Sequence, residues 1–572
     1  MNTFVLNIRL RRAFGGRVRA DIRDEGIVVS GELSDWGDVV RACQMCAKPH
    51  SKRHVINDIG FTGGADAPMR MPSVRDAALE GESPDVLIIG GGVSGASIAR
   101  ELRRWDVSVV LAEKEADVAL GASGRNDGEI HPGVDLGRGS LKHRYVRRGN
   151  AMYPQVCREL DVPFTRPGQY VCFRQGFLRP AAEAYCLVRR FRDGISDTRI
   201  ISGKKLRKLA PALNPDFRFA ISNPDSGCVC PYGLTIAYAE NAAQNGAVVS
   251  LSTAVTGMTV QNGVITAVHT NRGTLYPRLV INAAGVFAEE IARMAGDRFY
   301  SIHPRRGTNS ILDRKAGAYF DAIASVKLLQ SRRMHSKGGG ILHTVHDNLL
   351  VGPDAVETFE KENYATDPES IERVFRKQSI TMPGLSKADI ITYFTGVRAA
   401  TFEEDFIIEK GRRTKNLIHV AGIQSPGLTT APAVAEDVAA MAAAELSAYK
   451  PVRKNPAFDP IRKAPPALRN MSDDERSEMI RRNPDYGVIV CRCEEISRGE
   501  ILDALRAPVC VPTLDGVKKR VRPGMGRCQG GFCSPLVTEI IADFLGVEKY
   551  EVKKSGANSP VTLGNTKRGA QI

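Results

Sequence analysis

The 572-residue sequence lacks two features that would place it in or beyond a membrane. No stretch approaches the roughly 20 consecutive apolar residues that a membrane-spanning helix needs. The start, MNTFVLNIRLRRAFGG, puts a short apolar run before its arginines, which reverses the order of a secretory signal. We therefore expect a cytoplasmic protein with no transmembrane segment, one that would reach the inner face of a membrane only through a partner.

A disulfide scaffold and nucleic-acid motifs are also missing. Twelve cysteines in a chain of this length are too few to indicate a disulfide framework. The formal net charge is +15, yet no nucleic-acid recognition motif accompanies the basic residues. We expect no nucleic acid as a partner, and the charge favours an acidic substrate or an acidic partner subunit.

A chain this long exceeds one hydrophobic core and should contain three or more folding units. Residues 1–62 predict a small α/β unit: two strands within 18–33, a helix over 34–47 with Ser34 as N-cap, and a strand over 54–61. This order resembles BON-type domains. Composition predicts a linker at 63–83, an α/β domain over 84–448, a linker at 449–485, a cysteine-bearing domain over 486–547 and a disordered tail at 548–572.

The segment that starts at Asp85 predicts a dinucleotide-binding turn. DVLIIGG is typical of a strand buried on both faces, and Gly90, Gly92 and Gly95 follow it as G-x-G-x-x-G before a predicted helix. These glycines permit a tight turn, a close approach of the backbone to pyrophosphate, and close helix–strand packing. Glu113 ends the next predicted strand, where its carboxylate can accept hydrogen bonds from both ribose hydroxyls. The motif predicts a Rossmann-type fold but leaves FAD and NAD open.

Two later segments favour FAD through a resemblance. A predicted strand runs into Ala284 and Gly285 in LVINAAGVFAEEIARMAG, and HVAGIQSPGLTTAPAVAEDVA places a loop before a helix. Both are similar to FAD-contacting segments of the D-amino-acid oxidase/glycerol-3-phosphate dehydrogenase superfamily. The resemblance implies a helix N-terminus that faces the flavin pyrimidine, where positive potential favours the anionic reduced flavin. It places five further residues beside the cofactor, namely Gly422, Ser425, Gly427, Leu428 and Thr429.

After the second predicted strand comes the stretch GASGRNDGEIHPGVDLGRGSLKHRYVRRGN (121–150). It resembles the flavin-contacting segment of glycerol-3-phosphate dehydrogenases and L-2-hydroxyglutarate dehydrogenases. Asp127 and Glu129 depart from that pattern, which has a small and an apolar residue there. Oxidation of a secondary alcohol by hydride transfer to flavin N5 requires a base, and His131 is our candidate because histidine titrates near neutrality. The residues implied to bind the cofactor are Ser123, Arg125, Asn126 and Gly128.

Three more residues are candidates for the substrate side. TGVRAAT resembles the family segment whose arginine grips an anionic substrate, so Arg398 would bind a carboxylate or phosphate in a bidentate manner. His346 lies in a stretch that resembles the family's strand pair over the flavin, and a structural role is equally open. Arg306 occupies a turn where glycerol-phosphate oxidisers often carry lysine, so it would hold an anion or be a surface arginine.

Four cysteines near the C-terminus predict a metal centre. Cys491 and Cys493 form C-x-C, and Cys528 and Cys533 form C-x4-C after 34 intervening residues. Four thiolates in two close pairs match one centre, and C-x-C is tight for zinc, which normally uses C-x2-C. The segment resembles the BFD-like [2Fe-2S] domain, with zinc and disulfides as alternatives.

The motif order resembles catalytic subunits of the anaerobic glycerol-3-phosphate dehydrogenase family over roughly residues 84–547. The resemblance implies a Rossmann-type FAD-binding domain with an interleaved antiparallel-sheet substrate domain (α/β with an α+β part), then a helical BFD-like domain. It implies oxidation of a small anionic 2-hydroxy compound, first glycerol 3-phosphate, with electrons leaving through the cluster to a redox partner subunit or carrier. Alternatives are L-2-hydroxyglutarate or another 2-hydroxy acid, an amino or imino acid, and a non-catalytic flavin and iron–sulfur electron-transfer module.

Overall fold

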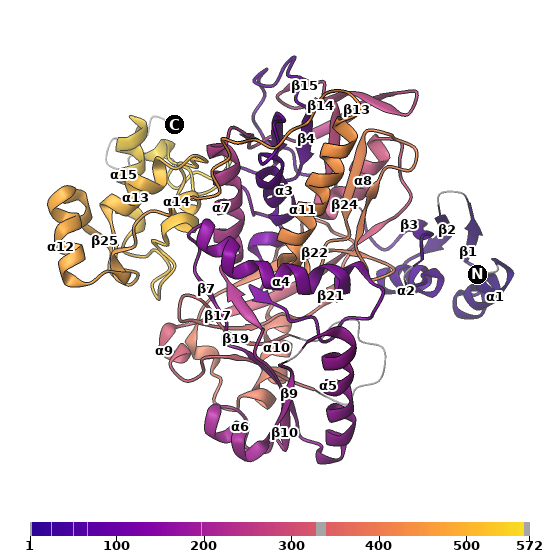
Figure 1. Cartoon of the computed structure of the whole chain (residues 1–572), viewed down its shortest axis with the longest axis horizontal. Helices are drawn as coiled ribbons and strands as arrows, with labels where there is room; N and C mark the ends of the chain where they lie inside the picture. Colours follow the sequence, from indigo (N-terminus) through magenta and orange to yellow (C-terminus); the bar gives the residue numbers. More distant parts are fainter. Residues whose placement is uncertain are drawn as a thin grey trace.

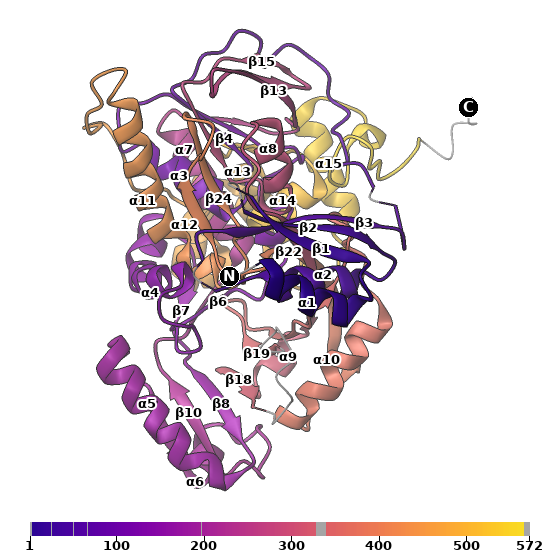
Figure 2. The same ribbon diagram turned by 90° about the vertical axis from the view of Figure 1, so that its right-hand side faces the viewer.

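The computed structural model describes residues 3–564 except 24, 25, 50, 66, 196 and 328–338. A small N-terminal unit and a small C-terminal unit lie on opposite sides of a large central body (Figure 1). Figure 2 looks onto the N-terminal unit, behind which the central body extends above and below. Within the described ranges, no helix combines the length and the apolar character needed to cross a membrane.

The N-terminal unit is a three-stranded sheet covered by two helices. Its elements are α1 (Thr3–Phe14), β1 (Val18–Ile22), β2 (Gly26–Leu33), α2 (Trp36–Cys46) and β3 (His54–Phe61). β1 and β2 are antiparallel, and β3 runs parallel to β2. The predicted strands and helix are present, but the N-cap of α2 is Asp35 and not Ser34, because the Asp35 carboxylate accepts the Asp38 N–H at 2.8 Å. α1 was not predicted, and the likeness to BON-type domains stays a prediction.

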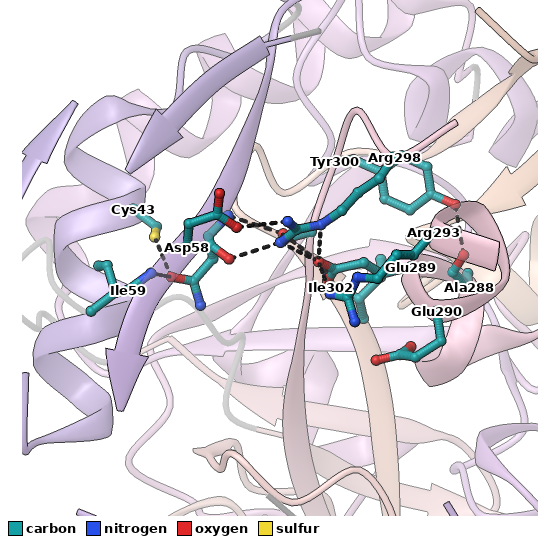
Figure 3. Close-up of polar contacts among 12 residues, drawn as sticks. Cys43, Asp58, Ile59, Ala288, Glu289, Glu290, Arg293, Arg298, Tyr300 and Ile302 are labelled. Carbon is teal, nitrogen blue, oxygen red and sulfur yellow. Dashed lines mark hydrogen bonds and ion pairs between the residues drawn. The ribbon is translucent and has the colours of Figure 1, made fainter. Parts of the chain in front are cut away.

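Arg298 fastens this unit to the central body (Figure 3). Its guanidinium donates to Asp58 Oδ1 of β3 at 2.6 Å and to Glu289 Oε1 of the central body at 2.8 Å. Glu289 in turn accepts the Ile302 N–H at 2.9 Å. A second contact comes from Glu403, whose carboxylate accepts the Val55 N–H at 2.7 Å. The unit is therefore held through both charged and backbone groups.

The upper half of the central body is a six-stranded sheet in the order β12-β5-β4-β16-β24-β23. All neighbours are parallel except β23, which is antiparallel to β24. The elements are β4 (Val86–Ile89), α3 (Val93–Leu102), β5 (Val109–Ala112), α7 (Pro231–Gln244), β12 (Val248–Ser250), β16 (Leu279–Asn282), β23 (Ile407–Lys410), β24 (Leu417–Ala421) and α11 (Gly427–Leu446). This is the Rossmann-type arrangement that the sequence predicts.

Both faces of this sheet are covered, which explains the continuous apolar run of β4. Val86 and Ile88 pack with α3 and α11, whereas Leu87 and Ile89 face the opposite layer. That layer consists of α8 (Ala288–Met294) and a three-stranded sheet. The strands of the latter are β13 (Val255–Gln261), β14 (Val264–Thr270) and β15 (Gly273–Leu275).

The lower half is a nine-stranded sheet inserted between strands of the first. Its strands are β8 (Gln169–Phe173), β9 (Arg199–Ser202), β10 (Phe219–Asn223), β17 (Ile302–Leu312), β18 (Ile323–Val326), β19 (Gly340–His343), β20 (Leu349–Gly352), β21 (Val356–Glu357) and β22 (Ile390–Thr401). All pairs are antiparallel except β8 with β18. Its helices are α5 (Arg179–Asp193), α6 (Gly203–Leu209), α9 (Arg314–Gly317) and α10 (Pro368–Thr381). A small sheet of β6 (Glu129–Ile130), β7 (Phe164–Thr165) and β11 (Gly227–Val229) joins the halves.

The C-terminal unit is mainly helical and packs against α7 (Figure 1). Its elements are β25 (Ile489–Cys491), β26 (Ile496–Ser497), α13 (Arg498–Leu505), α14 (Leu514–Val521) and α15 (Ser534–Leu545). The stretch expected to be a linker before it contains α12 (Asp473–Arg482). Part of the stretch expected to be disordered is folded: Val552 is buried in the core of this unit. Residues 565–572 of that predicted tail lie outside the described residues.

Candidate active site

The G-x-G-x-x-G turn lies between β4 and α3 and is shaped by contacts that exclude larger residues. Gly90 has φ +110°, and a Cβ there would lie 2.5 Å from the Ala283 carbonyl oxygen. A Cβ on Gly95 would lie 1.9 Å from the Gly90 carbonyl oxygen, so the helix can approach the strand only with glycine there. Gly92 caps α3 without a side-chain hydrogen bond, which leaves the helix N-terminus suited to an anion.

Glu113 follows β5 directly and faces this turn. Its carboxylate accepts the Gly91 N–H at 2.6 Å and the Glu115 N–H at 2.8 Å. Burial of the carboxyl group raises the pKa of Glu113 to about 7, against the two backbone hydrogen bonds, which lower it. A desolvated carboxylate beside the turn fits the role of accepting ribose hydroxyls.

Residues 122–128 form a folded loop against the same helix. The Ser123 hydroxyl accepts the Val93 N–H at 2.8 Å, at the first turn of α3. The Asn126 amide donates to the Ser123 carbonyl at 2.8 Å and accepts the Gly128 N–H at 2.9 Å, so it fixes the loop from within. Gly128 has φ +79°, and a Cβ there would lie 2.4 Å from the Val229 carbonyl oxygen. The loop is thus positioned by α3 and β11.

Arg125 lies at the edge of this loop. Its Nε donates to the Leu120 carbonyl at 2.9 Å, and its guanidinium stacks 4.1 Å from the centre of the Tyr364 ring. A Cβ on Gly396 of β22 would lie 2.4 Å from the Arg125 carbonyl oxygen. The loop therefore packs closely on the long strand that also carries Arg398.

The second and third predicted cofactor segments meet the first. Ala284 and Gly285 follow β16, and the Ala283 carbonyl contacts the space that a Cβ on Gly90 would fill. Gly285 and Gly422 both have positive φ, of +57° and +66°. Gly427 begins α11, which has no side-chain cap at its N-terminus. The adjacent Leu428 carbonyl accepts the Tyr153 hydroxyl at 2.6 Å, which anchors this turn to the surrounding core.

His131 is the centre of a chain of polar contacts. Its Nδ1 lies 3.2 Å from Glu129 Oε1, and its Nε2 lies 3.4 Å from the Ser425 hydroxyl. The same Glu129 oxygen accepts the Gln169 amide at 2.8 Å. The backbone N–H of His131 donates to the Thr429 hydroxyl at 2.9 Å. The imidazole is thus oriented by a carboxylate on one side and faces the loop before α11 on the other.

Arg398 lies on β22 and contributes positive charge to the same place. Two nitrogens of its guanidinium donate to the Asp354 backbone carbonyl at 3.1 and 3.2 Å. These two hydrogen bonds go to a neutral carbonyl and not to a carboxylate. Burial lowers the pKa of Arg398, and Asp127 opposes that shift. Burial and Glu129 raise the pKa of Asp127, while His131 and Arg398 act in the opposite direction. Acidic and basic groups are therefore balanced around His131.

The polar contacts of the Arg306 side chain and of the His346 backbone N–H lie outside this cluster, although the Arg306 carbonyl accepts a hydrogen bond from Arg398 Nη1 at 3.4 Å. The Arg306 guanidinium donates to the Ala365 carbonyl and lies 3.4 Å from Asp367, so its charge is used within the substrate half. The backbone N–H of His346 donates to Thr344, and burial together with neighbouring arginines holds the pKa of His346 well below its usual range. Those arginines are Arg522, Arg469 and Arg314. The substrate-side role of His346 and the structural one both stay predictions.

The four C-terminal cysteines form two pairs. The sulfurs of Cys493 and Cys528 lie 3.6 Å apart, close to the roughly 3.7 Å expected for two thiolates on one tetrahedral metal ion. Cys491 and Cys533 are hydrogen-bonded to one another, which lowers the pKa of Cys491 to about 6. Each pair could hold one iron ion, so the cysteine set fits a [2Fe-2S] cluster.

Sequence reasoning missed the roles of Glu129, Gln169 and Tyr364. Glu129 was noted as a departure from a pattern, but its pairing with His131 was not inferred. Alternation along a strand offered one signal, because residues two apart on an extended segment lie on the same face. Gln169 and Tyr364 come from distant segments, and no local signal marks them.

The comparisons with known proteins agree with this geometry. Residues 85–441 match the family model described as FAD dependent oxidoreductase. The chain belongs to this FAD-dependent oxidoreductase family. Residues 489–543 of the oxidoreductase match the BFD-like [2Fe-2S] binding domain. Its cofactors are FAD and a [2Fe-2S] cluster.

Three named proteins are similar to this chain over about two thirds or more of its length. The oxidoreductase is 38% identical over 491 residues to glycerol 3-phosphate dehydrogenase of Caloramator mitchellensis, covering 85% of this chain and all of that relative. It is 26% identical to one subunit of the anaerobic glycerol-3-phosphate dehydrogenase of Escherichia coli K12, covering 81% and 89% of the two chains. The structure of L-alpha-glycerophosphate oxidase from Mycoplasma pneumoniae with FAD bound is similar with a TM-score of 0.61 and 25% identity, covering 67% and 99%.

Proposed function

We propose that this FAD-dependent oxidoreductase oxidises glycerol 3-phosphate at its secondary hydroxyl and passes the electrons out through its [2Fe-2S] cluster. The observation that carries the proposal is the polar set of His131, Glu129 and Arg398 beside the loop that precedes α11. The 38% identical relative, which this chain covers throughout, supports the choice of substrate.

His131 is the proposed base. Its Nε2 lies beside the Ser425 loop and would take the hydroxyl proton, while Glu129 at Nδ1 stabilises the imidazolium that forms. FAD, when bound, supplies the hydride acceptor. Arg398 would bind the phosphate group, since a guanidinium forms two parallel hydrogen bonds to such an anion.

An amino or imino acid is the second candidate, and Asp127 is the observation that favours it. A carboxylate beside Arg398 would repel a phosphate dianion but would attract the ammonium group of an amino acid whose carboxylate is on Arg398. Solved structures of glycine oxidases have the same fold, with TM-scores of 0.56 and 0.57. L-2-hydroxyglutarate remains the alternative among hydroxy acids.

The electrons need a further acceptor. Two electrons arrive together as a hydride, whereas the cluster accepts and releases them singly. The name of the Escherichia coli relative describes one subunit of its enzyme. We propose that a redox partner subunit or carrier receives electrons from the cluster, and we keep the expectation of a cytoplasmic protein.

Substrate reduction of the flavin tests the proposal. We would add glycerol 3-phosphate, L-2-hydroxyglutarate or L-proline to the anaerobically purified protein and follow the flavin absorbance. Rapid bleaching by glycerol 3-phosphate, with little effect of the other two, is the expected result. Bleaching by L-proline alone would replace the proposal with the amino-acid alternative.

Two variants separate an enzyme from an electron-transfer module. His131→Asn should slow flavin reduction by about 100-fold, the lower end of the usual effect of a general base. Arg398→Met should instead raise the substrate concentration for half-maximal rate by about 10- to 100-fold, since it removes a charged hydrogen bond. If both variants keep FAD and cluster and both behave as the wild type, the catalytic proposal is wrong.

A further inference from the structure

Tyr232 lies between the flavin-contacting loop and the iron–sulfur unit. It is in the first turn of α7, directly after β11. On one side its Cβ is 3.5 Å from the position of a Cβ on Gly124, within the loop of residues 122–128. On the other side its hydroxyl donates to Met525 Sδ at 3.2 Å and accepts from Arg522 Nη1 at 3.1 Å. The Tyr232 side chain therefore lies close to the loop of residues 122–128 and hydrogen-bonds to the iron–sulfur unit through its hydroxyl.

The contact continues to the cluster ligands. Met525 is followed by Gly526, where a Cβ would lie 3.0 Å from the sulfur of Cys493. The backbone of Gly526 thus packs directly on a predicted ligand, and a side chain there would displace it. Tyr232 is thus linked toward Cys493 by its hydrogen bond to Met525, by the Met525–Gly526 peptide bond and by the close approach of the Gly526 backbone to Cys493. On the flavin side, Gly124 leaves space for no more than about one methyl group before the Tyr232 Cβ.

Charges around Tyr232 hold the same junction. Glu494 directly follows Cys493 in the sequence. Its Oε2 lies 3.1 Å from Arg522 Nε and 2.7 Å from the guanidinium of Arg314 in α9. Glu494 is only 2% exposed, so this carboxylate ties the iron–sulfur unit to the substrate half in a desolvated setting. Burial raises the pKa of Tyr232, which keeps its phenol neutral.

We propose that Tyr232 is the positioning residue that couples the flavin to the [2Fe-2S] cluster for electron transfer. This rests on the proposed function, because it concerns the route by which electrons leave the flavin. In each transfer, the reduced flavin loses one electron and one ferric ion of the cluster becomes ferrous. No bond forms or breaks at Tyr232, which is not itself oxidised and keeps its hydroxyl proton.

The test measures transfer between the cofactors without the substrate. In the holoenzyme, a light flash with a sacrificial electron donor reduces the flavin, and the absorbance and electron paramagnetic resonance of the cluster report the arrival of the electron. Tyr232→Phe removes only the hydroxyl contacts with Met525 and Arg522 and should slow the rate by about two- to threefold. Tyr232→Leu removes the ring and should slow the rate by about tenfold or more. Because the flash replaces the substrate, failure of glycerol 3-phosphate as a substrate would not affect this result.

A docking control separates coupling from loss of contact between units. Asp117 pairs with Arg520 of α14 at 2.9 Å and holds the iron–sulfur unit through a contact that does not involve Tyr232. Hydrogen exchange of residues 514–528 reports docking in Asp117→Asn and in Tyr232→Leu. Slow transfer in Tyr232→Leu with wild-type protection and an unchanged cluster spectrum supports the proposal.

Three results would overturn it. The first is a wild-type transfer rate in Tyr232→Leu, and the second is equal slowing in Tyr232→Phe and Tyr232→Leu. The third is that Tyr232→Leu and Asp117→Asn lose hydrogen-exchange protection and transfer rate to the same extent. If Tyr232→Leu does not retain the cluster, Met525→Ala breaks the same series of contacts from the other side. It should then slow transfer several-fold, and an unchanged rate would equally contradict the proposal.

Discussion

The carboxyl group of Glu113 lies at the end of β5 with a pKa raised by burial to about 7. Ribose hydroxyls donate hydrogen bonds to a carboxylate, so FAD binding favours the charged form and releases a proton from the neutral one. The FAD affinity of the apoprotein should therefore rise about tenfold between about pH 6 and pH 8, as Glu113 ionises. Titration of the apoprotein with FAD, followed by flavin fluorescence, measures this.

The raised pKa of Glu113 also makes the stability of the apoprotein depend on pH. Because the folded pKa is above the ordinary value of 4.5, the neutral group stabilises the apoprotein at low pH, and this contribution is lost as the pH rises to about 7. Glu113→Gln is the matched control. It should bind FAD more weakly, with an affinity that no longer changes over this pH range. A wild-type affinity that is independent of pH would contradict the assignment.

Glu129 offers a second prediction for a single residue. Glu129→Leu restores the apolar residue of the family pattern but removes the carboxylate from His131 Nδ1 and from Gln169. Without this partner the imidazole loses its orientation and the stabilisation of its charged form, so flavin reduction by the substrate should slow by about tenfold or more. Stopped-flow absorbance measures the rate, and FAD content serves as the control. Equal rates in the variant and the wild type would show that the pairing does not position the base.

Single residues were predictable where one local reason sufficed. Gly90 and Gly95 are confined to glycine by the backbone of their own turn, and the cysteine pattern is defined by spacing alone. The role of Tyr232 depends instead on how α7 comes to lie beside the loop of residues 122–128, and that of Gln169 on how β8 comes to lie beside Glu129. Such neighbours are determined by tertiary packing, which the sequence does not display locally.

At the scale of elements, the approach of α3 to β4 is the feature most sensitive to change. Gly95→Ala would place a methyl group 1.9 Å from the Gly90 carbonyl oxygen, so the helix must move away from the phosphate-binding turn. We expect a cost of about 1–3 kcal/mol and purification with greatly reduced FAD content. Gly384→Ala is the control, because a Cβ there has no neighbour within 4 Å. Flavin absorbance per protein distinguishes the two, and full FAD in Gly95→Ala would contradict the argument.

Elements whose apolar residues stand out in the sequence were predictable, whereas an amphipathic helix rich in arginine was not. β3 has the bounds expected from its sequence, because alternation and flanking polar residues agree. No helix was predicted over residues 3–14, although Leu6, Leu10 and Phe14 recur at helical spacing and are buried in α1. Its arginines lie on the exposed side of the same helix, so charge and helix were compatible.

At the scale of the whole molecule, the two segments expected to be linkers pack against the central body. Leu79 in the first is buried against the layer of β13–β15, and Arg462 in the second pairs with Glu240 of α7 at 2.7 Å. Their proline and charge content did not indicate that α12 forms in the second segment or that both segments pack on the central body. The surfaces on which they pack lie far away in the sequence. The domain boundaries themselves stay predictions.

The division of labour between the two cofactor units can be tested by removing one ligand. Cys528 is partly exposed and belongs to the C-terminal unit, whose core is separate from that of the FAD sheet. Cys528→Ala should therefore lose the cluster but keep FAD and its reduction by the substrate. Anaerobic dithionite titration should consume about two electrons per chain in place of about three, since the flavin takes two and the cluster one. Cys510→Ala, an exposed cysteine outside the four, should still take about three. Loss of FAD along with the cluster would show that the two units do not hold their cofactors independently.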